Sequence, residues 1–365
     1  MTTQRLALLV LLAATGVCTS LALPRFASRT GAKCQSCHVN PAGGAMRQPF
    51  GVQYGREQLP VPEWSKDFAL EDFSNVITNV LGVGADFRTL FFYQQVPNAT
   101  AHNGLYAMQG DVYLNFRIAK RVAFFLKKGL RNGFEAYGLL NVLPASGHLK
   151  VGKFLPNFGT RIDDHTTYIR QVTGMSPDQG RVERTGLEAA ISPGPFTITG
   201  GVYNAEEGDL PPTSNEKAFL GRVEGMFTLS SDLFLGLGGN VLTKKVGGIR
   251  STYYGGMGSV SWGTLTVLGE ADLVKNKSPL GITVTEFVSY VEADMVVTPG
   301  LDLKLGYDFH DFDVDYKTGA ISRYSVGFEF FPLSGVEVRP LYRIIKEDPN
   351  AGNKNEFDLL LHLYL

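Results

Sequence analysis

Most of the chain alternates between apolar and polar residues with a period of two. Apolar side chains stand at every second position from Phe357 to Leu365, with Asp358, His362 and Tyr364 between them, and residues 106–118 show the same alternation. Successive side chains of a β-strand point to opposite faces, so this pattern predicts strands with one apolar and one polar face.

The predicted strands follow one another with few interruptions from residue 74 onward. Turn-forming residues separate them, among them Ser192-Pro193-Gly194 and Pro299-Gly300. We expect about 16 strands, near residues 76–93, 105–119, 121–128, 132–143, 147–154, 181–192, 195–204, 216–229, 232–245, 249–261, 263–275, 281–297, 300–315, 320–332, 335–346 and 355–365.

Two all-β architectures are compatible with this alternation. A soluble β-protein buries the apolar face of each strand. Long strands in near-continuous hairpins favour instead a transmembrane barrel, whose tilted strands need about 9–11 residues and face lipid on one side. Closing the sheet also satisfies every backbone polar group, as a bilayer requires. The sequence therefore predicts an all-β fold, a transmembrane antiparallel β-barrel over residues 74–365.

Composition agrees with a β-rich exported chain and excludes some functions. The 34 Lys and Arg residues balance 35 Asp and Glu residues, so the chain lacks the basic excess typical of nucleic-acid binding. Glycine (42), phenylalanine (24) and tyrosine (15) are abundant. The only cysteines are Cys18, Cys34 and Cys37, so no disulfide framework can hold the barrel.

The first 22 residues resemble a secretory signal peptide. An apolar run, Leu6–Val17, follows a positive charge and precedes small residues that favour cleavage after Ala22. The alternative is an uncleaved anchor, but the run is shorter than the roughly 20 residues that span a bilayer. Val17 fits poorly before a lipoprotein cysteine, so we expect Cys18 to leave with the signal and the mature chain to be exported.

The sequence CQSCH at residues 34–38 is the attachment pattern of a c-type haem. Its two thiols would add to the haem vinyl groups, and His38 would become the proximal iron ligand. A zinc site would need a fourth ligand nearby, and a thioredoxin-like CxxC would need a βαβ context; neither is found in the sequence. We therefore expect one covalent haem c on Cys34 and Cys37.

The second axial ligand of the iron stays open. Met46 lies eight residues after His38, far enough along the chain to pass around the haem edge. His165 lies in RIDDHTTYIR, within the non-alternating residues 155–180, which are too long for a hairpin turn. This stretch is either an external loop or an insert in the lumen, polar enough to hold a haem propionate or ligate the iron. The third alternative is that neither residue binds.

The haem segment, residues 23–73, is short for a domain that must bury its cofactor alone. The stretch that follows the motif, VNPAGGAMRQPFG, is rich in turn formers and cannot build a core. A barrel of about 16 strands encloses a lumen large enough for a channel or a plug. We therefore expect the haem segment to plug the lumen, with the barrel shielding the haem.

Three short motifs carry a resemblance to a known family. The segment LPRFASRTG (23–31), the CxxCH motif and PFG (49–51), followed by a barrel, resemble the outer-membrane cytochrome–porin fusions of iron-oxidising bacteria. The resemblance implies a single haem in the barrel or at its mouth that passes electrons from an extracellular donor, classically ferrous iron, to periplasmic carriers. Cys34, Cys37 and His38 match the attachment motif of that family, whereas NPAGGAMR (40–47) departs from it and leaves the donor and the direction of electron flow open.

The hypothesis is therefore an electron-transfer protein of the bacterial outer membrane rather than a bond-making enzyme. Its partners would be the lipid bilayer, a periplasmic cytochrome or other carrier, and an extracellular donor or acceptor. Two alternatives remain: a solute porin with a structural or sensory haem, and a haem-based peroxidase or ligand-binding protein.

Overall fold

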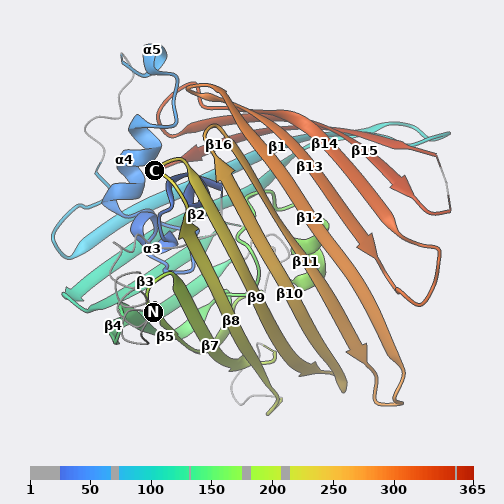
Figure 1. Cartoon of the computed structure of the whole chain (residues 1–365), viewed down its shortest axis with the longest axis horizontal. Coiled ribbons are helices and arrows are strands. Elements are labelled where there is room, and N and C mark those ends of the chain that lie inside the picture. Colours follow the sequence, from blue (N-terminus) through green and yellow to red (C-terminus); the bar gives the residue numbers. More distant parts are fainter. Residues whose placement is uncertain (1–24, 67–73, 131–132, 175–181, 207–213, 350–351) are drawn as a thin grey trace, which may run out of the picture.

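The computed structural model describes residues 25–66, 74–130, 133–174, 182–206, 214–349 and 352–365. The predicted signal peptide lies outside these residues. Sixteen antiparallel strands form one closed barrel (Figure 1). They are β1 (Leu81–Gln95), β2 (His102–Ala119), β3 (Val122–Gly129), β4 (Phe134–Leu143), β5 (Gly147–Phe154), β6 (Arg184–Ile191), β7 (Phe196–Asn204), β8 (Lys217–Thr228), β9 (Leu233–Val246), β10 (Ile249–Trp262), β11 (Leu265–Lys277), β12 (Thr283–Thr298), β13 (Leu301–Asp311), β14 (Ile321–Phe330), β15 (Val336–Glu347) and β16 (Lys354–Tyr364).

The barrel closes between its first and last strands. Each strand pairs with its sequence neighbours, and β1 pairs with β16 in a register that matches Asp86 with Tyr364 and Gln95 with Asn355. Closure leaves no sheet edge with unpaired backbone groups. The prediction of an all-β antiparallel barrel with about 16 strands is therefore confirmed.

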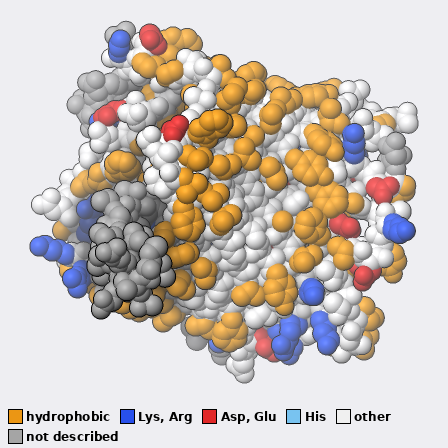
Figure 2. All heavy atoms as spheres, viewed as in Figure 1, with side chains coloured by type: hydrophobic (Ala, Val, Ile, Leu, Met, Phe, Trp, Pro, Cys, Tyr) orange, Lys and Arg blue, Asp and Glu red, His pale blue; other side chains and the backbone are white. Residues whose placement is uncertain are grey.

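The two faces of the strands differ as the alternation predicts. In β16, Leu359, Leu361 and Leu363 are exposed on the outside, whereas Asp358 and His362 are buried inside. Figure 2 shows apolar side chains spread over the outer face of the strands, with most of the visible charged side chains toward the ends. An outward apolar band of this kind suits contact with lipid tails.

The predicted start of the first strand is wrong. Residues 76–80 were expected to begin it, but β1 begins at Leu81. The backbone amides of Ile77 and Thr78 both donate to the carbonyl of Leu81, so the chain turns back on itself here. The side chain of Asn75 donates to the carbonyl of Arg47 and fixes this turn against residues 25–66, here called the N-terminal segment. Alternation alone cannot reveal such a turn.

The two ends of the barrel differ in the length of their connections. At one end every connection is short, from two residues (120–121) to five (331–335). At the other end the connections reach residues 155–183, between β5 and β6. We call these the short-turn end and the long-loop end. The described part of the longest connection contains the helix α6 (Tyr168–Thr173).

In the described residues ahead of the barrel the chain forms four short helices: α2 (Arg25–Thr30), α3 (Cys34–Cys37), α4 (Pro49–Glu57) and α5 (Pro62–Ser65). They contact the wall at the short-turn end. Ser28 donates to Ser259 at 2.8 Å, and the Val61 amide donates to the carbonyl of Phe331 at 2.9 Å. Figure 1 shows α4 and α5 beside one end of the barrel. No helix in the described ranges has the length and apolar character needed to cross a bilayer.

The inner wall is not uniformly polar. Five buried aromatic rings follow one another across β2, β3, β4, β5 and β7, with neighbouring centroids 5.1 to 6.1 Å apart. They are Tyr113, Phe125, Tyr137, Phe154 and Tyr203. Val39 of the N-terminal segment and Leu155 and Phe158 of the long connection pack in the same cluster. The apolar part of the wall is therefore covered by the chain itself rather than by water.

Candidate functional site

The CxxCH motif forms one helical turn followed by a tight loop. The His38 amide donates to the carbonyl of Cys34 at 2.8 Å, which closes α3. The following residues return through a backbone bridge between His38 and Arg47. Gly43 and Gly44 in this loop have positive φ values of 85° and 71°, which glycine adopts without steric cost. Residues 40–47, which differ from the cytochrome–porin sequences, therefore form the loop that folds beside His38.

Helix α4 lies against α3 at a glycine. A Cβ atom on Gly51 would stand only 2.2 Å from the carbonyl oxygen of Cys37. The Gln48 side chain donates to the carbonyls of Gln35 (2.9 Å) and His38 (3.1 Å), which joins the two helices further. The PFG motif thus supports the CxxCH turn through close backbone packing.

His38 is held as a neutral imidazole with one nitrogen occupied. Its Nδ1 lies 3.4 Å from the carbonyl oxygen of Ala45, which assigns the proton to Nδ1 because a carbonyl can only accept. Burial, with a smaller contribution from nearby Arg47, lowers the pKa of His38 to about 4. A neutral imidazole whose Nδ1 donates to a carbonyl offers Nε2 to a metal, the usual arrangement of a ligating histidine.

The two cysteines flank this site without bonding to each other. Neither Cys34 nor Cys37 forms a disulfide. Burial raises the pKa of the Cys34 thiol to about 12. The Cys34 sulfur lies beside Gly43, and the residue lines a side cavity together with Arg161 and Glu224. Cys37 is half-buried, and burial raises its pKa as well.

A larger cavity, here called the inner cavity, opens beside His38. Its volume is about 200 Å³, somewhat below the roughly 300–1,000 Å³ of typical ligand sites. Three parts of the chain line it: the N-terminal segment, the barrel wall and the long connection. Its lining includes His38, Arg47, Asp86, Arg88, Tyr113, Arg161, His165, His362 and Tyr364.

The two candidates for the second iron ligand lie in different places. His165 lines the inner cavity with His38, and its Nε2 accepts a hydrogen bond from Arg88 at 3.4 Å. Met46 is buried against the wall, where a Cβ on Gly82 would lie 2.6 Å from its methyl carbon. Met46 is not among the residues that line the inner cavity. The fold thus brings His38 and His165 to one cavity and uses Met46 to pack the N-terminal segment against β1.

The long connection crosses the lumen and is held on several strands. Thr160 donates its amide to Glu270 at 2.5 Å, and Arg222 donates to the carbonyl of Gly159 at 2.5 Å. Asp164 pairs with Arg343 of β15. The described residues of this connection, 155–174, therefore form an insert in the lumen, one of the two alternatives that the sequence allowed, and we call them the lumen loop.

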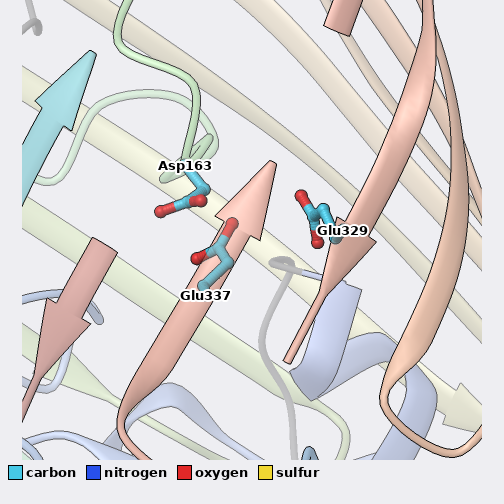
Figure 3. Close-up of side chains that lie close together, drawn as sticks. All are labelled: Asp163, Glu329 and Glu337. Atoms are coloured by element: carbon cyan, nitrogen blue, oxygen red, sulfur yellow. The ribbon is translucent and has the colours of Figure 1, made fainter. Parts of the chain in front are cut away.

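Three carboxylates meet where the lumen loop touches the wall. Oxygen atoms of Asp163, Glu329 and Glu337 lie within 4.8 Å of one another (Figure 3). Arg339 pairs with all three, at 2.8, 3.2 and 3.7 Å respectively. Arg88 adds a second contact to Asp163 at 2.7 Å. With arginine at its centre, this cluster acts as an ionic clamp between the loop and the barrel.

The charged residues of the inner wall do not stand out in the sequence. His362 places Nε2 2.8 Å from Asp86 and Nδ1 2.8 Å from Glu337, beside the inner cavity. The signal for them in the sequence is the placement of charges at alternate, inward-facing positions, such as Glu337, Arg339 and Arg343 in β15. Each inward charge on its own is unremarkable in a barrel, so only the register between strands shows which charges meet.

Comparisons with known proteins agree with this architecture. The fold matches an anion-selective porin from Comamonas acidovorans, with a TM-score of 0.58, 13% identity, and coverage of 78% of this chain and 99% of the porin. It also matches OmpT, an outer-membrane protein of Vibrio cholerae (TM-score 0.57, 14% identity, 80% and 99% coverage). OprB of Pseudomonas putida gives a TM-score of 0.60, 10% identity, and 78% and 94% coverage.

This chain has a porin-like barrel. At identities this low the likeness concerns the fold alone. No protein-family model matches the sequence, and no curated protein matches it. The porin-like barrel carries in addition a CxxCH turn at its short-turn end and a lumen loop that shares the inner cavity with it.

Proposed function

We propose that this porin-like barrel resides in the bacterial outer membrane, carries one c-type haem in its lumen, and transfers electrons across the membrane. The observation that supports this most is the position of His38 of the CxxCH motif, on an internal cavity between the N-terminal segment and the lumen loop. The haem would be attached through Cys34 and Cys37, with His38 as proximal ligand.

The residues around the inner cavity fit such a haem. His38 has its Nδ1 engaged by Ala45 and its Nε2 available, both cysteines are outside any disulfide, and the cavity lining supplies a second imidazole, that of His165. When bound, a haem supplies reversible one-electron chemistry at its iron. The chain's own part is to hold the imidazole, to exclude bulk water and to position charges around the cavity.

Two cavities on either side of the lumen loop support a route for electrons. A second cavity opens at the long-loop end, where it is lined by Phe92, Glu347, Lys354 and Thr166. His165 lines the inner cavity, and the adjacent Thr166 lines this outer cavity. A donor or acceptor in the outer cavity would thus be separated from the haem by little more than the lumen loop.

The orientation of the barrel assigns a partner to each end. Outer-membrane barrels place short turns in the periplasm and longer loops outside the cell. The N-terminal segment contacts the short-turn end, so a periplasmic cytochrome or other carrier would approach the haem from there. The extracellular partner would enter the outer cavity. In this proposal the extracellular electron donor would be ferrous iron, which the resemblance to cytochrome–porin fusions implies.

In this proposal His165 would be the second residue to hold the haem iron. It lines the same cavity as His38, whereas Met46 packs against Gly82 and Gly84 of β1. Ligation by His165 would need its Nε2 to exchange the hydrogen bond from Arg88 for the iron, or the ring to turn.

A second candidate is a solute porin whose haem is structural or sensory. The fold comparisons favour it, because the matched structures include an anion-selective porin. The contents of the lumen argue for electron transfer instead: the ionic clamp fixes the lumen loop across it, and the N-terminal segment contacts the short-turn end.

One preparation distinguishes the two candidates. The purified protein is assayed for covalent haem by mass spectrometry and for ion conductance in planar bilayers, beside a Cys34→Ala, Cys37→Ala variant. Electron transfer predicts one haem per chain in the wild type, none in the variant, and low conductance in the wild type. A large solute conductance that the variant retains unchanged would support the porin instead.

A further inference from the structure

Arginines around the inner cavity differ in how their charges are balanced. Arg25 pairs with Glu329 and Asp294, and Arg88 pairs with Asp86 and Asp163. Arg161 lines the same cavity. Among the described residues, however, no carboxylate oxygen lies within 4.0 Å of its guanidinium nitrogens, the distance that defines an ion pair. Arg161 is therefore a cation of the cavity wall without a direct counter-charge.

The immediate surroundings of Arg161 leave donors unused. Its Nη2 donates to the carbonyls of Leu155 (3.2 Å) and Pro156 (3.3 Å). Its Nε is buried and has no hydrogen-bond partner among the described residues. The Oγ1 of the neighbouring Thr160, which is 4% exposed and lines the same cavity, is also buried without a partner there. Leaving buried donors without a hydrogen-bond acceptor is unfavourable.

An anion in the cavity would satisfy both donors. Arginine is the side chain best suited to a carboxylate, because its fork of N–H groups matches two oxygens. Burial lowers the pKa of Arg161, and the nearby carboxylates of Glu135 and Glu188 offset this only in part. A haem carries two propionate carboxylates, so it would bring this anion with it.

We propose that Arg161, assisted by the hydroxyl of Thr160, binds one propionate of the haem. This inference rests on the proposed function, since it needs a haem in the inner cavity. The haem is joined covalently to the N-terminal segment, whereas Arg161 belongs to the lumen loop. The propionate therefore links the two segments across the cavity, and Arg161 positions the haem and raises its reduction potential by favouring the less positive ferrous state.

The test is the midpoint potential of the haem-loaded protein as a function of pH. Variants are Arg161→Gln, which removes the charge, and Arg161→Lys, which keeps it without the fork. Lys244→Gln is the matched control, because Lys244 is another cation of the barrel wall that stacks on Tyr253 and does not line the inner cavity. Each variant is first checked for heat-modifiable migration and covalent haem.

We expect Arg161→Gln to shift the ferric–ferrous equilibrium about tenfold toward ferric, a fall of about 59 mV for one electron. Its potential should also gain a pH dependence, as the released propionate titrates, and the propionate bending mode in the Raman spectrum should move. Arg161→Lys should lie between wild type and Arg161→Gln, and Lys244→Gln should stay within twofold of wild type.

Other outcomes contradict the proposal in distinguishable ways. Loss of covalent haem from the wild-type protein overturns both the proposed function and this inference. A haem-loaded Arg161→Gln protein with wild-type potential and Raman spectrum overturns the inference alone. A third outcome combines two results: the haem-free Cys34→Ala, Cys37→Ala protein binds inorganic phosphate through Arg161, and haem-loaded Arg161→Gln keeps the wild-type potential. The inference then also fails, because the site would hold a free anion rather than a propionate.

Discussion

At the scale of single residues, the proposed site depends on a few atoms with defined tasks. Ala45 holds the Nδ1 of His38, Gly51 lets α4 approach α3, and His165 faces the same cavity from the lumen loop. The residues that the sequence motif names are thus supported by residues that it does not name, and each of them can be tested separately.

Replacing His165 should change the coordination of the iron. In the haem-loaded protein, His165→Ala is expected to convert a six-coordinate low-spin spectrum into a five-coordinate high-spin one, because it removes the proposed distal nitrogen. Visible and electron paramagnetic resonance spectra measure this. Met46→Leu is the control, a volume-conserving change that costs less than about 1.5 kcal/mol and should leave the spectrum unchanged. The reverse pattern would make Met46 the ligand.

Replacing Gly51 should impair haem attachment. In Gly51→Ala the new methyl group would stand 2.2 Å from the carbonyl oxygen of Cys37, so α4 must move away from the attachment turn. Overpacking of this kind costs about 1–3 kcal/mol. We expect a reduced yield of covalent haem, measured by absorbance per chain. Gly55→Ala in the same helix meets only the Tyr364 ring at 3.3 Å and should keep most of the haem; equal yields would argue against this packing role.

At the scale of elements, the lumen loop is held by charges from distant strands. Asp164 pairs with Arg343, and its other oxygen accepts hydrogen bonds from the amide and hydroxyl of Thr166 at 2.8 and 2.7 Å. Burial alone would raise the pKa of Asp164, but Arg343 and neighbouring arginines hold it well below its usual range. Its stabilising contribution is therefore present above about pH 3.9 and is lost only as the pH falls through the lowered value.

Removing this charge should loosen the loop. Breaking a buried ion pair by neutralising one partner costs about 3–5 kcal/mol. In Asp164→Asn we expect faster hydrogen exchange of backbone amides between residues 157 and 173. In the wild type, the local opening equilibrium of these residues should stay the same from pH 7 to pH 5. Asp315→Asn, in an exposed connection, is the control. Unchanged exchange in Asp164→Asn would show that the pair does not hold the loop.

The sequence was informative about elements wherever the signal is local. Period-2 alternation located the strands, and the contiguous CxxCH motif coincides with a single helical turn. It failed at residues 76–80, where a turn fixed by Asn75 and Arg47 has the same alternation as a strand. It could not place the lumen loop, because that depends on Arg339 and Arg343, which lie more than 170 positions further along the chain.

At the scale of the whole molecule, the barrel would insulate a single redox centre from the membrane in the proposed function. A porin-like barrel would ordinarily enclose a water-filled lumen, but here an aromatic wall, the lumen loop and the N-terminal segment pack together inside it. The same packing that would bury a haem would also reduce the space for solutes. Low conductance and haem binding are therefore expected to change together.

Deleting the N-terminal segment should separate these two properties from barrel formation. Without residues 23–66 downstream of the signal, the barrel strands are intact, so we expect a folded, heat-modifiable barrel without haem. Its conductance in planar bilayers should exceed that of the wild type several-fold, since the short-turn end would open. A wild-type conductance as large as that of the deletion variant would contradict a closed lumen.

Electron passage across a sealed membrane tests the central claim most directly. The purified haem-loaded protein is inserted into liposomes that enclose ferricyanide, and a membrane-impermeant reductant is added outside. We expect the enclosed ferricyanide to be reduced in wild-type liposomes and to stay oxidised in liposomes with the Cys34→Ala, Cys37→Ala variant. If the haem is present and the wild-type liposomes reduce ferricyanide no faster than the variant, this barrel does not conduct electrons across the membrane.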